Sequence, residues 1–165
     1  MMLKKLIISM TLLCITSIGM AEGEARIFVD FNAPEKFTDF KTMASFSDTK
    51  REKLMENLRQ LMIESTNNYI PVDYKMTYTI NNIDMAGTFQ LGNSDLYRVV
   101  NQSDRIRLDF SYELVDSEEK IVKKEDVNIS STNPKILSLK KNKYKNTTFS
   151  HEMPLFDEWV RNLDF

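Results

Sequence analysis

Apolar and polar side chains alternate strictly from Ile106 to Leu114, within a strand predicted at 105–115, and this pattern restricts the fold more than any other in the chain. Because successive side chains of a β-strand point to opposite faces, it predicts a strand with one face on a core and one in water. A polar link at 116–119 leads to a second strand, predicted at 120–129. Since a link this short cannot carry a parallel crossover, the two strands are expected to form an antiparallel hairpin.

Two segments have the apolar spacing of helices. In residues 48–67, Leu54, Leu58 and Met62 recur at intervals of four, which predicts a long helix with one buried face. Ser47 is the expected N-cap of this helix. A short helix is predicted at 154–163, where a proline occupies the first turn and apolar residues share one face.

Further strands are expected at 26–31, at 73–80 and, as a short element, at 96–100. Residues 81–94 are polar and contain two glycines, so they are expected to form turns. The order of elements predicts an α+β fold, namely a mainly antiparallel sheet with one long helix packed on a face and a short C-terminal helix.

The chain is poor in the residues from which most functional sites are built. It has one His, one Cys and four Gly among 165 residues, and its net charge is −2. A zinc site needs three or four suitable ligands, a phosphate-binding loop needs several glycines, and a nucleic-acid surface is normally basic. We therefore expect no metal, no cofactor and no nucleic-acid partner, and the composition favours a protein that is not an enzyme.

Residues 1–21 have the pattern of a secretory signal peptide. Lys4 and Lys5 precede an apolar stretch, and small residues stand at the cleavage spacing that ends at Ala21. The expected mature chain is a single domain at 22–165 without a transmembrane segment, located in the periplasm. The alternatives are an outer-membrane lipoprotein modified at Cys14 and an uncleaved anchor.

Catalysis would have to rely on His151, which is the only imidazole of the chain. Paired with a carboxylate such as Asp39 or Asp84, it could act as the general base of a hydrolase. The alternative is a His without a chemical role, just before the last helix. Asp84 is also a candidate ligand-binding residue. The alternative is a turn in which Asp84 caps nearby backbone amides and Gly87 takes a positive φ.

Basic residues supply the remaining candidate binding site. Lys140, Lys141 and Lys143 belong to a lysine-rich segment that could meet anionic lipid or a polyanionic glycan. The alternative is a solvated loop that protects a sheet edge from aggregation. Arg105, at the start of the alternating strand, is a further candidate.

Four segments, in this order and spacing, resemble one family of proteins. They are Val29-Asp30-Phe31-Asn32-Ala33-Pro34-Glu35-Lys36-Phe37-Thr38-Asp39, Ile83-Asp84-Met85-Ala86-Gly87, Arg105-Ile106-Arg107-Leu108-Asp109-Phe110-Ser111-Tyr112, and the segment from His151-Glu152 to Trp159. The chain resembles small exported proteins of gram-negative bacteria catalogued as domain of unknown function three thousand and sixteen. The resemblance covers nearly the whole mature chain, and it implies a periplasmic address and no established activity.

The leading functional hypothesis is a periplasmic, non-enzymatic binding or accessory protein of the cell envelope. The strand at 106–114 or the strand at 120–129, if it lies at a sheet edge, could accept a strand from an envelope protein. The alternatives are an envelope hydrolase that uses His151 with a carboxylate and a structural protein without a specific ligand.

Overall fold

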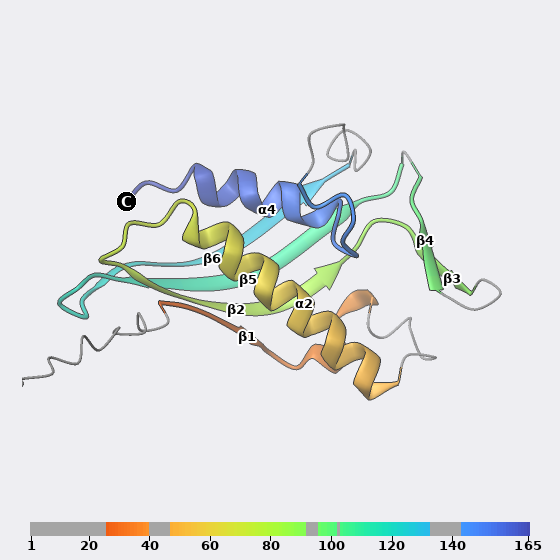
Figure 1. The fold of residues 1–165 in the computed structure, drawn as a ribbon, viewed down its shortest axis with the longest axis horizontal. Coiled ribbons are helices and arrows are strands. Elements are labelled where there is room, and N and C mark those ends of the chain that lie inside the picture. The colour runs from red at the N-terminus through yellow and green to blue at the C-terminus, as the bar shows by residue number, and fades with distance from the viewer. Residues whose placement is uncertain (1–25, 40–46, 92–95, 102, 133–142) are drawn as a thin grey trace, which may run out of the picture.

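The computed structural model describes residues 26–39, 47–91, 96–101, 103–132 and 143–165. Four strands form the main sheet: β1 (Ile27–Phe31), β2 (Lys75–Asp84), β5 (Ile106–Val115) and β6 (Ile121–Ser131). Their spatial order is β1-β2-β5-β6, so β1 and β6 are its edges (Figure 1). The predicted signal peptide with Cys14, and also Lys140 and Lys141, lie outside the described residues.

The hairpin expected from the alternating pattern is confirmed, because β5 pairs antiparallel with β6 and also with β2. β5 is therefore internal, so of the two strands that the binding hypothesis named as conditional edges, β6 lies at an edge and β5 does not. The sheet is also mixed, since β1 pairs parallel to β2. The long helix α2 (Asp48–Asn67) connects β1 with β2 and allows both strands to start at the same end of the sheet.

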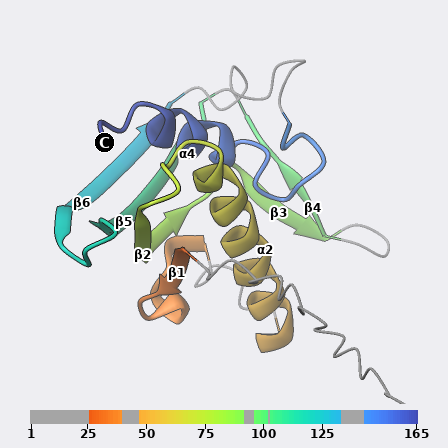
Figure 2. The same cartoon turned by 60° about the vertical axis from the view of Figure 1, so that its left-hand side comes forward.

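Two helices cover one face of the sheet. α2 begins and ends as predicted, and its N-cap Ser47 accepts a hydrogen bond from the Lys50 amide at 3.4 Å. α4 (Glu152–Arg161) starts two residues before the predicted helix and lies beside α2 (Figures 1 and 2). Between the helices and the sheet, aromatic rings pack edge to face, including Phe110 on Trp159 with ring centroids 4.8 Å apart.

The polar segment after β2 contains structure that the sequence did not predict. β3 (Thr88–Leu91) lies in this segment and pairs with β4 (Leu96–Val99), the short strand expected at 96–100. They form a small second sheet, visible to one side of the main sheet in Figure 2. The chain reaches β3 through Gly87 at φ +86°, where a Cβ atom would stand 2.1 Å from the Val99 carbonyl oxygen. Only glycine fits there without displacing the backbone. Among the described residues, no helix is long and apolar enough to cross a membrane.

Candidate functional site

Two buried carboxylates meet the turn that follows β2. The backbone amide of Met85 donates to Asp39, and the amide of Ala86 donates to Glu152 Oε1 at 3.2 Å. Asp39 is 8% exposed, and Glu152 is fully buried. The expected capping residue, Asp84, ends β2 instead, so these turn amides are bound by two acids that lie far away in the sequence.

A buried ion pair completes this cluster, which we call the carboxylate junction (Asp39, Arg98, Glu152 and the turn 84–87). Arg98 of β4 holds Glu152 at the start of α4 through two bonds, Nη1 to Oε1 at 2.8 Å and Nη2 to Oε2 at 3.1 Å. Such bidentate pairs are strong and directional. The junction thus ties the small sheet, the first turn of α4 and the segment after β1 to the end of β2.

Asp39 titrates in an unusual range because of this environment. Burial raises its pKa from 3.8 to about 6, although the Met85 amide works in the opposite direction. The negative charges of Asp84 and Glu152 raise the pKa further, and Arg98 lowers it. Perturbed acids gather at functional sites, but they also occur in structural networks. With both carboxylates enclosed and bonded to backbone amides, the junction has the geometry of a structural support.

His151 borders a pocket of about 390 Å³ next to the junction. The described residues that line it are Phe89, Arg98, Val100, Lys145, Asn146, Thr147, Thr148, Ser150 and His151. This set contains three basic side chains and several hydroxyl groups, but neither Asp39 nor Asp84 is in it. The structure therefore places His151 at a pocket without bringing to it either acid that the hydrolase hypothesis named.

The other predicted binding residues do not form one described surface. Lys143 pairs with Asp157 of α4 at 2.9 Å, and its ammonium lies 4.9 Å from the centre of the Tyr144 ring. Burial disfavours the charge of Lys143, but hydrogen bonds with Asp157 and Tyr144 outweigh that effect and raise its pKa. Lys143 thus helps to attach its segment to α4. Arg105 is exposed immediately before β5.

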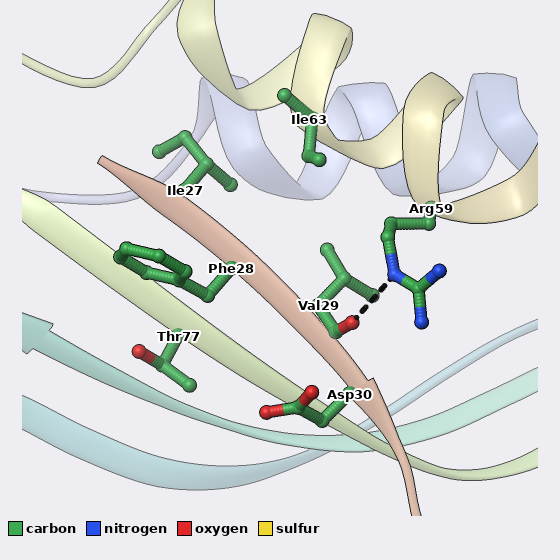
Figure 3. A pocket seen from close by; sticks show the side chains of 7 residues that line it. All are labelled: Ile27, Phe28, Val29, Asp30, Arg59, Ile63 and Thr77. Atoms are coloured by element: carbon green, nitrogen blue, oxygen red, sulfur yellow. Dashed lines mark hydrogen bonds between the residues drawn. The ribbon is translucent and has the colours of Figure 1, made fainter. Parts of the chain in front are cut away.

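A second cavity lies along β1, where the sequence did not place a site. It measures about 570 Å³, and we call it the β1 groove; it is lined by Ile27, Phe28, Val29, Asp30, Arg59, Ile63 and Thr77. Figure 3 shows that Ile63 and Arg59 reach it from α2, while the other side is β1 itself with Thr77 of β2. Phe28 keeps 44% of its surface exposed, unusual for a large apolar side chain on a strand.

The backbone of β1 has polar groups facing away from the sheet. The Met76 amide donates to the Arg26 carbonyl at 2.8 Å, and the Asn32 amide donates to the Ile80 carbonyl at 2.9 Å. Since alternate residues of a parallel strand bond to the same neighbour, the backbone groups of Ile27, Val29 and Phe31 point outward. Among the described residues, the one bond recorded to these groups comes from Arg59, whose Nε donates to the Val29 carbonyl at 2.9 Å (Figure 3).

Comparison with known proteins places the chain in a family. A search of curated proteins gives no match. A family model described as "Protein of unknown function (DUF3016)" matches residues 25–162, which include every described strand and helix. The match confirms the resemblance seen in the four sequence segments: the chain belongs to the DUF3016 family of proteins of unknown function.

Proposed function

We propose that this chain is an exported, non-enzymatic binding or accessory protein of the cell envelope, and that it binds an extended segment of a partner polypeptide along β1. The observation that carries this proposal is the β1 groove. There, outward backbone groups of an edge strand run beside apolar side chains of β1 and α2. Edge strands of this kind can be extended by a strand of another chain, with main-chain hydrogen bonds giving affinity and side-chain pockets giving specificity.

The second edge of the sheet is less suited to this role. β6 carries four consecutive charged residues, Lys123, Lys124, Glu125 and Asp126. Charged side chains along an edge are a common protection against pairing with other chains. β1 lacks such a run and has an apolar groove beside it, so it is the edge that we assign to the partner.

The periplasmic location rests on the sequence of residues 1–21, with its basic start, apolar stretch and small residues before Glu22. Fractionation of the cells that make the protein, followed by N-terminal sequencing, tests it. We expect a periplasmic chain that begins at Glu22. A chain recovered with a lipid on Cys14, or with residues 1–21 intact, would contradict the proposed processing.

Site-specific photocrosslinking in the same cells tests the binding role. A photoreactive phenylalanine analogue replaces Phe28 in one protein and Val122 in a matched control. Both residues are exposed, at 44% and 47%, and they stand on opposite edge strands. We expect one reproducible adduct with an envelope protein from position 28 and none from position 122. Adducts from position 122 alone, or from neither position, would refute the assignment to β1.

A further inference from the structure

Arg59 limits how far a partner strand can follow β1. Its Nε donates a hydrogen bond to the Val29 carbonyl. Its guanidinium carbon lies 5.2 Å from the centre of the Phe31 ring, beyond Val29 along the strand. Among the described residues, the Ile27 amide and carbonyl and the Val29 amide have no recorded partner. The part of the edge without described partners is therefore a short ladder on Ile27 and Val29, each 4% exposed, and it ends at Arg59, which also pairs with Glu56.

The direction of an added strand follows from these groups. If the added strand runs parallel to β1, one of its residues donates its amide to the Ile27 carbonyl and accepts a hydrogen bond from the Val29 amide. The amide two residues later in the added strand then requires the Val29 carbonyl as its acceptor. Because Arg59 holds that carbonyl, a parallel strand pairs with β1 without displacing Arg59 only up to one more residue, and a chain that ends at that residue needs no turn away from the edge. Its terminal carboxylate then lies on the side of Val29 where the guanidinium is. An antiparallel strand that stopped there would instead bring its amino terminus to Arg59, and the two positive charges would repel.

We propose that the β1 groove binds the carboxyl-terminal tail of a partner protein as a parallel strand, with the terminal carboxylate on the guanidinium of Arg59. This inference rests on the proposed function and names its ligand. Arg59 keeps donors for the carboxylate, because the described contacts use only Nε, on Val29, and Nη1, on Glu56. Arginine and carboxylate groups form charge-assisted hydrogen bonds, which are roughly twice as strong as neutral ones.

The same register predicts the side chains of the tail. The penultimate residue stands opposite Phe28 and shares its face of the sheet, because paired residues of neighbouring strands point to the same side. The last residue and the third from last stand opposite Val29 and Ile27, on the side of α2. The groove is apolar there, with Ile27 and Ile63 facing each other across it (Figure 3). The preferred tail therefore has apolar residues at its last and third-last positions.

A library of hexapeptides tests this inference. The peptides are immobilised through their amino ends, vary in the last three residues, and are made both as free acids and as carboxamides. We expect binding by free acids with apolar last and third-last residues, at least about tenfold tighter than by the amides. In hydrogen exchange with a bound free acid, the amides of Ile27 and Val29 should become protected.

Variants of α2 identify the role of Arg59. Arg59→Gln removes the charge at the groove, and Lys53→Gln removes an exposed charge elsewhere on the same helix as a control. We expect Arg59→Gln to weaken free acids about tenfold and leave the amides unchanged, and Lys53→Gln to change neither. Thermal unfolding of both variants checks that they are folded. If Arg59→Gln strengthens acids and amides alike, Arg59 is a shield of the edge and the inference is overturned.

The experiment separates the failure of this inference from that of the proposed function. Free acids and amides that bind equally, and that protect Ile27 and Val29, would refute the carboxylate while supporting strand addition at β1. Peptides that bind without protecting these amides, or a library without any binder, would refute both.

Discussion

Replacing Asp39 with asparagine should remove a large part of the pH dependence of stability. The carboxyl has a pKa of about 6 in the folded chain and 3.8 as the reference value, a difference of about two units. At about 1.4 kcal/mol per unit, the free energy involved is about 3 kcal/mol. Since Asp39 is only 8% exposed, solvent screening reduces this figure little.

The sign follows from the direction of the shift. The folded chain holds the Asp39 proton more tightly than the unfolded chain, so this group favours folding most below pH 4. Its contribution is lost as the pH rises from about 4 to about 6. The asparagine of the Asp39→Asn variant cannot ionise, and its amide oxygen can still accept the Met85 amide. This variant should therefore match the natural chain near pH 4 and exceed its free energy of unfolding by up to about 3 kcal/mol at pH 7.5.

Urea unfolding between pH 4 and pH 8 measures this difference, with the fluorescence of Trp159 as the probe. Trp159 is the only tryptophan and packs against Phe110, so its emission should report loss of the core. Asp73→Asn, at an exposed position before β2, is the charge-matched control and should show no such trend. An Asp39→Asn variant that is less stable than the natural chain at pH 7.5, or a difference that does not change with pH, would refute the account of Asp39.

Three other substitutions test the supports of the fold, each by urea unfolding. Arg98→Leu leaves the buried Glu152 without its partner and should cost about 3–5 kcal/mol, whereas the double variant Arg98→Leu with Glu152→Leu should recover part of that loss. Gly87→Ala should cost more than about 2 kcal/mol, because the added Cβ meets the Val99 carbonyl at a positive φ. Burial alone would raise the pKa of Asp157, but hydrogen bonds from Lys143, Ser65, Tyr144 and Tyr69 lower it to about 2. Asp157→Asn should therefore cost about 2 kcal/mol of stability at pH 7, and this loss should shrink as the pH falls from about 4 toward 2. Equal stability of any of these single variants and the natural chain at pH 7 would contradict the contact concerned.

Local patterns predicted the elements whose signals lie within a few residues. The helix at 48–67 has its cap, its apolar spacing and its end in one stretch, and its bounds agree with the structure. The hairpin of β5 and β6 follows from alternation and a short link. β3 was missed because its four residues lie in a polar segment, and β4, with which they pair, is itself short.

The polar contacts of the junction could not be predicted in the same way. Asp39 and the Met85 amide are 46 positions apart, and Arg98 and Glu152 are 54 apart. Nothing in the local sequence pairs them, because they meet only after the small sheet and α4 have packed at the end of β2. The sequence did single out Asp39, Asp84 and the start of α4 as parts of recognisable segments. Asp84 was the acid expected to cap the turn amides, whereas Asp39 and Glu152 accept their hydrogen bonds.

The β1 groove depends on strand order, which is a property of the whole sheet. Residues 26–31 read as a strand, but only the parallel pairing with β2 and the position at the edge leave the Ile27 and Val29 amides facing outward. The contribution of Arg59 depends likewise on α2 crossing above β1. A hydrophobic pattern alone does not distinguish an edge strand from an internal one.

The most direct test of the account is the NMR structure of the chain bound to its tightest free-acid hexapeptide. The account predicts interstrand NOEs between the peptide and residues 27–29 in a parallel register, with the terminal carboxylate next to the Arg59 side chain. Contacts to β6, or to the pocket beside His151, with residues 27–29 unchanged, would contradict the central claim that β1 is the binding edge.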